Sequence, residues 1–235
     1  MAIILAAGAS RRMGSPKALL PWGSGTFVQH LCALLDTLSL TGAVISRPEL
    51  AARLQVGWPI HLNADPERGM LSSLQVALEH TPANCPWLMV VLVDQPAILP
   101  ETFRVMAAQA STRGWSSPVY EGRRGHPVVI GCECFASLRA ARPDQTPREV
   151  LAQFPRTLVE VSDPGINLDF DTPEELQAFQ TRRSSPEIVR FAGPAAQSRA
   201  VGGEQQANGQ QLTQATTRAA AQHKAAQAHP EGGGA

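Results

Sequence analysis

The chain has 235 residues, of which 43% are apolar, so it is long enough for one large domain or two small ones. Its 20 acidic and 20 basic residues give a formal net charge of zero, which provides no overall attraction to nucleic acid or to an anionic membrane. No apolar run reaches the roughly 18 residues of a membrane span, and a strand predicted from residue 2 leaves no room for a signal peptide. We therefore expect a soluble, cytoplasmic protein that binds neither nucleic acid nor membranes.

The first predicted strand, residues 2–5, leads directly into a loop of small and then basic residues. The small residues at 6–10 allow a ligand to lie against the backbone, where successive N–H groups can turn towards an anion. Arg11, Arg12 and Lys17 add two planar guanidinium groups and one ammonium charge. The spacing fits neither a Walker A loop nor a G-x-G-x-x-G motif. The loop predicts a polyphosphate site at the end of a strand, and the alternative is a turn whose basic residues are solvated.

Strands and helices are predicted to alternate along most of the remaining chain. The spacing of apolar residues, with proline and capping residues at the boundaries, predicts helices at residues 26–38, 49–55, 70–78, 100–111, 133–142, 147–154 and from 173 onwards. Strands are predicted at residues 43–45, 59–63, 88–93, 128–130 and 158–161, the third of them without a polar break. This alternation with short turns predicts an α/β fold built on a mostly parallel sheet, in a single domain of residues 1–183.

The composition changes after about residue 183. Residues 184–235 are dominated by Ala, Gln, Gly, Ser and Thr and contain few large apolar side chains. Such a segment cannot bury enough surface to offset the entropy lost on ordering. We expect a disordered, low-complexity tail.

Carboxylates follow two of the predicted extended segments. Asp94 ends the apolar strand at 88–93, and its side chain is expected to face the same crevice as the first loop. Polyphosphate chemistry needs Mg²⁺, which takes one or two protein carboxylates, although Asp94 could instead cap a turn. Asp169 and Asp171 are two residues apart on an extended segment, so both could face one cation; alternatively, Asp171 caps the helix that follows.

Several of these segments resemble one known family. The first loop matches the pattern L-A-A-G-x-S-x-R-M-G-x-x-K at Leu5, Gly8, Ser10, Arg12, Met13, Gly14 and Lys17. It is similar to the signature loop of the MobA-like nucleotidyltransferases, and most similar to that of the molybdenum cofactor cytidylyltransferases. Further segments resemble family motifs: G-M-L-S-S-L at 69–74, V-L-V-D-Q-P at 91–96, G-H-P at 125–127 and D-F-D-T-P-E at 169–174. Val93 stands where the family usually has Gly, and the match is loosest at 144–148.

The resemblance implies a Rossmann-like (GT-A-like) fold with helices on both faces of the sheet. It implies transfer of CMP from CTP to the terminal phosphate of molybdopterin with release of pyrophosphate, with Mg²⁺ as cofactor and a molybdoenzyme or its chaperone as a candidate partner. The implied catalytic residues are Arg12, Lys17 and Asp94, and the implied metal ligands are Asp94 and Asp169. Nucleotide contacts are implied for Leu5, Ala6, Ala7, Gly8, Ser10, Arg12, Lys17, Ser72 and Ser73, and acceptor contacts for Gly125, His126 and Pro127.

Two other functions remain open at this point. An enzyme that uses a sugar phosphate or polyol phosphate would share the first loop and Asp94, although the G-H-P and D-F-D segments favour the molybdopterin reading. A nucleotide-binding accessory protein that carries molybdopterin without turnover would use the same residues. The base is predicted from Ala7, because guanylyl-transferring relatives tend to carry Gly there and a methyl group narrows the space beside a two-ring base.

Overall fold

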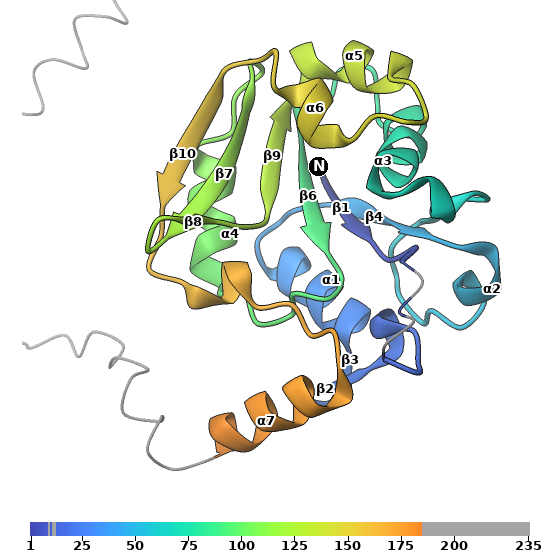
Figure 1. Ribbon diagram of the computed structural model, residues 1–235, viewed down its shortest axis with the longest axis vertical. Helices are drawn as coiled ribbons and strands as arrows, with labels where there is room; N and C mark the ends of the chain where they lie inside the picture. Colours follow the sequence, from blue (N-terminus) through green and yellow to red (C-terminus); the bar gives the residue numbers. More distant parts are fainter. Residues whose placement is uncertain (9, 11–12, 185–235) are drawn as a thin grey trace, which may run out of the picture. The chain divides into compact units, whose positions relative to one another are not determined.

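The computed structural model describes residues 1–8, 10 and 13–184, and in this part of the chain an eight-stranded mixed sheet forms the centre of the fold (Figure 1). The strands of this sheet are β1 (Ala2–Leu5), β4 (Gly42–Ser46), β5 (Ile60–Leu62), β6 (Trp87–Leu92), β7 (Trp115–Tyr120), β8 (Arg123–Arg124), β9 (Val128–Gly131) and β10 (Arg156–Glu160). A separate two-stranded ribbon pairs β2 (Pro21–Trp22) with β3 (Gly25–Thr26). Arg11, Arg12 and the predicted tail beyond Ser184 lie outside the described residues.

The strand order is β10-β7-β9-β6-β1-β4-β5, and β8 pairs with β7. Strand β1 is parallel to both of its neighbours, with Leu5 opposite Leu92 of β6 and Ile45 of β4, so these strands end at one edge. Strand β9 is antiparallel to β6 and β7 because the hairpin that leads into it is too short for a crossover. The predicted Rossmann-like, mostly parallel α/β fold is confirmed, and β9 makes the sheet mixed.

Helices follow the predicted pattern, but four of them are clearly shorter than expected. They are α1 (Phe27–Thr37), α2 (Pro48–Ala51), α3 (Met70–Glu79), α4 (Pro100–Ala108), α5 (Phe135–Ala140), α6 (Pro147–Leu151) and α7 (Pro173–Ser184). The predicted helix at 133–142 begins instead as a 3₁₀ turn, Cys132–Cys134, which delays α5. Helices α2 and α6 end well before residues 55 and 154. Among the described residues no helix is long and apolar enough to cross a membrane.

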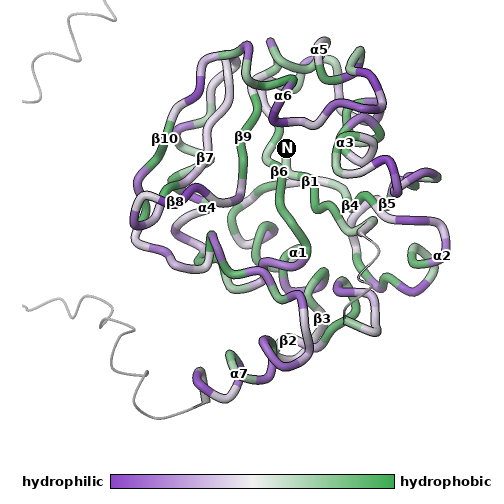
Figure 2. The backbone as a smooth tube through the Cα atoms, viewed as in Figure 1, coloured by the Kyte–Doolittle hydropathy of each residue, from purple (hydrophilic) through white to green (hydrophobic). Residues whose placement is uncertain are grey.

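Apolar side chains alternate between the two faces of the sheet, and each face has its own core. Ala2 and Ile4 of β1 pack in the core that contains α1 and α4, whereas Ile3 and Leu5 pack in the core formed with α3, α5 and α6. Figure 2 shows the central strands β1 and β6 as hydrophobic along their length, as expected for strands covered on both faces. This double burial leaves the ends of the strands as the place for polar chemistry.

A cluster of aromatic side chains holds the segment before α7 against the sheet. The Phe170 ring lies 5.8 Å from that of Trp22, 6.0 Å from that of Phe27 and 5.1 Å from that of Phe179, measured between centroids. Phe170 is 3% exposed, and its N–H donates to the backbone carbonyl of Asp94 at 3.2 Å. The cluster therefore ties the segment that carries Asp171 to the end of β6.

Replacing Phe170 with Ala should lower the free energy of unfolding by about 3 to 5 kcal/mol, because a large buried ring is lost and a cavity remains. Leu168→Ala is the matched control, since Leu168 is 36% exposed and should cost less than about 1 kcal/mol. Urea unfolding followed by circular dichroism measures both values. Equal losses in the two variants would contradict the anchoring role of Phe170.

Candidate functional site

A cavity of about 340 Å³ opens at the carboxyl edge of β1 and β6, and we call it the loop cavity. It contains most of the predicted nucleotide site, namely Leu5, Ala6, Ala7, Gly8, Ser10, Lys17, Ser73 and Asp94. Its lining also includes Pro66, Gly69, Met70 and Asp171, which come from the turn before α3 and from the segment before α7. Residues far apart in the sequence thus meet where the strands end, as in other open α/β sheets.

The ammonium group of Lys17 lies between two carboxylates in this cavity. Its Nζ is 2.8 Å from Oδ2 of Asp94 and 2.5 Å from Oδ1 of Asp171. The three side chains are 13%, 24% and 27% exposed, so the charges are partly shielded from water. Burial lowers the pKa of Lys17, but the hydrogen bonds to Asp171 and Asp94 and the charges of both outweigh it, so the net shift is upward. Lys17 is therefore a fixed positive charge at neutral pH.

Asp171, and not Asp169, stands beside Asp94. Asp169 is exposed and is absent from the residues that line the cavities described here. Residues 169–171 form no strand, so the alternation of side chains along a strand does not place both carboxylates on one face. The buried Phe170 stands between them in the sequence. The expectation that Asp169 shares a crevice with Asp94 does not hold in this structure, and the metal role predicted for Asp169 remains untested.

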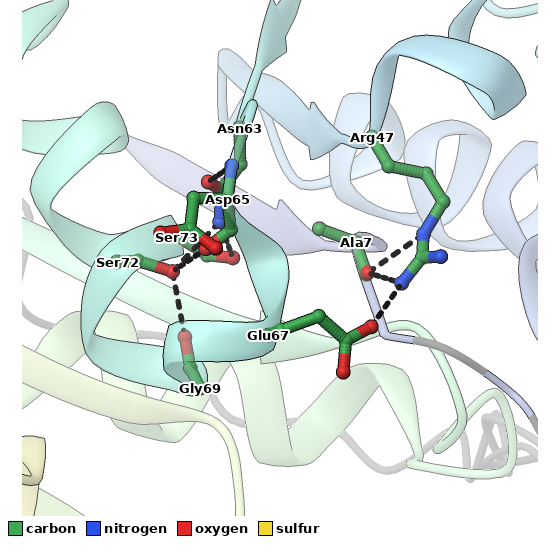
Figure 3. A network of polar contacts seen from close by, with 8 residues as sticks. All are labelled: Ala7, Arg47, Asn63, Asp65, Glu67, Gly69, Ser72 and Ser73. Carbon is green, nitrogen blue, oxygen red and sulfur yellow. Dashed lines mark hydrogen bonds and ion pairs between the residues drawn. The ribbon is translucent and has the colours of Figure 1, made fainter.

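The backbone of the first loop is held from two sides. Ser10 accepts a hydrogen bond from the N–H of Lys17 at 3.0 Å. Arg47, the residue after β4, donates from Nε and Nη2 to the carbonyl of Ala7, at 3.1 and 2.8 Å (Figure 3). Its Nη2 also lies 3.9 Å from a carboxylate oxygen of Glu67. No motif marks Arg47 in the sequence, because its role depends on β4 lying beside β1.

The turn before α3 is held by a buried amide. Asn63 is 2% exposed and donates to the hydroxyls of Ser72 at 2.8 Å and Ser73 at 2.9 Å, while its own oxygen accepts from the N–H of Asp65 (Figure 3). Ser72 also lies 2.8 Å from the carbonyl of Gly69. Of the two serines predicted to contact the nucleotide, Ser73 lines the loop cavity, whereas the hydroxyl of Ser72 bonds to its own turn.

A second cavity of about 800 Å³ adjoins the first, and we call it the arginine cavity after the four arginines in its lining: Arg68, Arg123, Arg124 and Arg148. The two cavities share Leu5, Gly69 and Met70 in their linings, so they adjoin at these residues.

The predicted acceptor segment contributes two residues to the arginine cavity. Gly125 and His126 line the arginine cavity, whereas Pro127 is buried behind it. Gly125 packs so closely on Ile166 that a Cβ would lie 2.0 Å from the carbonyl oxygen of Ile166, so a larger residue would push the segment out of place. Burial lowers the pKa of His126 to about 4, although the charge of Asp94 acts in the opposite direction. His126 is therefore neutral at pH 7 and adds no charge to the cavity.

The fold and the two joined cavities define a nucleotide-handling α/β protein, and comparison with known proteins identifies its family. The MobA-like NTP transferase domain matches residues 2–158, so the chain belongs to that family and is a nucleotidyltransferase. It is 29% identical to the molybdenum cofactor cytidylyltransferase of Escherichia coli (strain K12) over 188 residues, which cover 77% of this chain and 95% of the relative. It is 26% identical to the purine catabolism protein PucB of Bacillus subtilis (strain 168), over 74% of this chain and 92% of that protein.

Solved structures share the fold at low identity. Rv0371c from Mycobacterium tuberculosis H37Rv superposes with a TM-score of 0.64 at 24% identity, covering 75% of this chain and 94% of Rv0371c. Molybdopterin-guanine dinucleotide biosynthesis protein A from Archaeoglobus fulgidus gives a TM-score of 0.60 at 16% identity, over 78% of this chain and 98% of that one. Both support the Rossmann-like architecture derived from the strand order.

The low pKa of His126 predicts a loss of stability in mild acid. The unfolded chain takes up the proton near pH 6.5 and the folded chain only near pH 4, so protonation between these values favours unfolding. We expect the His126 contribution to the free energy of unfolding to fall by about 3 kcal/mol from pH 7.5 to pH 4. In urea unfolding across this range, His126→Gln should lack that part of the slope. Parallel pH curves for the two proteins would contradict the buried, neutral imidazole.

Proposed function

We propose that the protein transfers CMP from CTP to the terminal phosphate of molybdopterin and releases pyrophosphate. The observation that supports this most is the position of Lys17, Asp94 and Asp171 in the loop cavity, which adjoins a second, larger cavity at Leu5, Gly69 and Met70. A triphosphate in the loop cavity and an acceptor in the arginine cavity would meet there. The names of the Escherichia coli relative and of the Archaeoglobus fulgidus protein support molybdopterin as the acceptor.

In the proposed reaction the protein positions the two phosphates and neutralises their charge, and it supplies little covalent chemistry. An oxygen of the acceptor phosphate attacks the α-phosphorus of CTP, the bond from that phosphorus to the bridging oxygen breaks, and the electron pair leaves with pyrophosphate. Lys17 would hold the phosphates together with Arg12, which lies outside the described residues. The backbone of Leu5, Ala6, Ala7 and Gly8 would face the base, and Gly125 and His126 would contact the acceptor. Pro127 is buried and would support these two residues.

The donor set fits a divalent cation. Two carboxylates, Asp94 and Asp171, already face one positive charge in the loop cavity, and hard oxygen ligands suit Mg²⁺ or Mn²⁺. One related structure, that of Rv0371c, is a complex with manganese. We propose Asp94 and Asp171 as the residues that would hold Mg²⁺, in place of the pair Asp94 and Asp169. The cation would neutralise charge that develops on the phosphates.

Substitution of the three aspartates separates these assignments. Asp94→Asn and Asp171→Asn should each lower kcat/KM by about 100-fold or more, because an amide is a poorer ligand for a hard cation. Asp169→Asn is the matched control and should change kcat/KM by less than about threefold, since its side chain is exposed. Rates are measured over a range of Mg²⁺ concentrations, with melting temperatures to confirm folding. If Asp169→Asn lowers kcat/KM as much as Asp94→Asn does, Asp94 and Asp169 are the better assignment of the metal ligands.

The side chain at position 7, Ala7, predicts that the enzyme prefers CTP to GTP. It is buried in the lining of the loop cavity, where its methyl group would leave less space for guanine than for cytosine. Steric rejection of this kind is worth ~1 to 3 kcal/mol, so we expect CTP to be used roughly ten- to a hundredfold better than GTP. Equal concentrations of the two nucleotides are offered together and the dinucleotide products quantified. Ala7→Gly should reduce the preference for CTP over GTP. A wild-type protein that prefers GTP would contradict the assignment of cytosine as the base.

Pyrophosphate release on mixing the protein with CTP, Mg²⁺ and molybdopterin tests the proposed function as a whole. Release only when a sugar phosphate or polyol phosphate replaces molybdopterin would favour another transferase of the same chemistry. Binding of molybdopterin without release would indicate an accessory protein. We also propose that the catalytic domain ends at residue 183 and that the protein is cytoplasmic.

A further inference from the structure

The side chain of Arg47 contacts two segments that border the loop cavity (Figure 3). Its Nε and Nη2 donate to the carbonyl of Ala7 in the first loop, and its Nη2 lies 3.9 Å from Glu67 in the turn before α3. Arg47 directly follows β4, which pairs in parallel with β1, so the sheet brings this guanidinium to the end of β1. Glu67 is exposed and its ion pair is largely screened, so the bonds to Ala7 are the stronger contact.

The two hydrogen bonds occupy the carbonyl oxygen of Ala7. A backbone carbonyl has two lone pairs, and two N–H groups of Arg47 already donate to it, at 3.1 and 2.8 Å. Hydrogen bonds from a charged donor are stronger than those from a neutral one, and the planar guanidinium fixes their direction. The Ala7 carbonyl is therefore held in one orientation and is not available as an acceptor for a ligand.

The orientation of this carbonyl also fixes the direction of the next N–H. The carbonyl of Ala7 and the N–H of Gly8 belong to one peptide unit, which is trans. In a planar trans peptide these two groups point in opposite directions. Because Arg47 binds the carbonyl, the N–H of Gly8 points away from Arg47.

Gly8 lies in the lining of the loop cavity, and the space beside it is open. Apart from its neighbours in the chain, no described atom lies within 4 Å of the place where a Cβ on Gly8 would be. No described residue accepts a hydrogen bond from the N–H of Gly8. A backbone donor without a partner, in an open cavity wall, suits an acceptor oxygen of a ligand.

The path of the first loop on either side of this peptide does not depend on Arg47. Before it, the N–H of Ala6 donates to the carbonyl of Ile45 at 2.8 Å. After it, the hydroxyl of Ser10 accepts from the N–H of Lys17 at 3.0 Å. Loss of the Arg47 side chain should therefore free one peptide unit, while β1 and the bond that places Lys17 stay intact.

We propose that Arg47 is a positioning residue for the nucleotide. It holds the peptide between Ala7 and Gly8 so that the N–H of Gly8 donates to an acceptor oxygen of CTP, while Arg47 itself contacts no substrate atom. This rests on the proposed function in that CTP occupies the loop cavity. No motif marks this role, because it depends on β4 lying beside β1.

Binding of CTP to the full-length protein, with Mg²⁺ and without an acceptor, tests the proposal in the absence of turnover. We expect isothermal titration calorimetry to show about tenfold weaker binding for Arg47→Gln, because the donor of Gly8 is no longer held in place. Arg47→Lys keeps the charge but loses the planar pair of donors, so its affinity should lie between those of the wild type and Arg47→Gln. Arg53→Gln is the matched control, since Arg53 is an exposed arginine outside both cavities, and it should bind CTP like the wild type.

The amide resonance of Gly8 gives a second measurement, which a merely structural role of Arg47 would not change. The protein is labelled with ¹⁵N-glycine, and the Gly8→Ala variant identifies the resonance as the one that disappears. In the wild type, CTP should move the amide proton of Gly8 downfield. In Arg47→Gln at saturating CTP this shift should fall to less than about half. Melting temperatures show whether each variant is folded.

Three results would overturn the proposal. They are a Gly8 amide in the wild type that does not respond to CTP, an affinity of Arg47→Gln for CTP within about twofold of the wild type, and an Arg47→Lys variant that binds CTP like the wild type. The last result would show that only the charge of Arg47 matters.

Turnover separates this proposal from the proposed function. A wild type that binds CTP with this dependence on Arg47 but releases no pyrophosphate with molybdopterin would refute the proposed transfer and keep the role of Arg47. Release of pyrophosphate by the wild type, with an unchanged KM for CTP in Arg47→Gln, would refute the role of Arg47 and keep the proposed function. A wild type that does not bind CTP would overturn both.

Discussion

Two carboxylates, Asp94 and Asp171, share one ammonium group at the carboxyl edge of the sheet. Placed side by side in a crevice that is partly shielded from water, they would repel each other without a cation between them. Lys17 supplies that cation in this structure, and the backbone bond from Phe170 to the carbonyl of Asp94 keeps the two carboxylates at the same place. The site thus places two carboxylates around one positive centre, an arrangement compatible with the divalent cation proposed above.

This arrangement depends on how the loops are held, because each of the three charged side chains comes from a different part of the chain. Lys17 is placed by the first loop, whose Ser10 accepts from the Lys17 N–H and whose Ala7 carbonyl accepts from Arg47. Asp171 is placed from the other side by the aromatic cluster around Phe170. Hydrogen bonds therefore secure one side of the crevice and apolar packing secures the other.

Much of this fold can be predicted from the sequence, because the apolar run of β6 and the capping boxes of α1 and α7 depend on local residues. The first loop and Asp94 could also be placed at one edge, since they follow strands that read as buried and parallel. The antiparallel position of β9 is harder to predict, because it depends on the hairpin through β8 and on pairing with β6. The early ends of the short helices α2 and α6 are also hard to predict, because the apolar residues beyond them, Leu54 and Phe154, still pack against the cores.

The parts of the site that could not be predicted from the sequence are those that depend on contacts between distant segments. Asp169 and Asp171 are equivalent in a two-residue spacing, and only the packing of Phe170 decides which of them reaches Asp94. Arg47 and the arginines of the second cavity belong to no sequence motif, since their positions at the cavities depend on how the chain folds. In a chain with no net charge, folding gathers Arg68, Arg123, Arg124 and Arg148 around one cavity and Asp94 and Asp171 around the other.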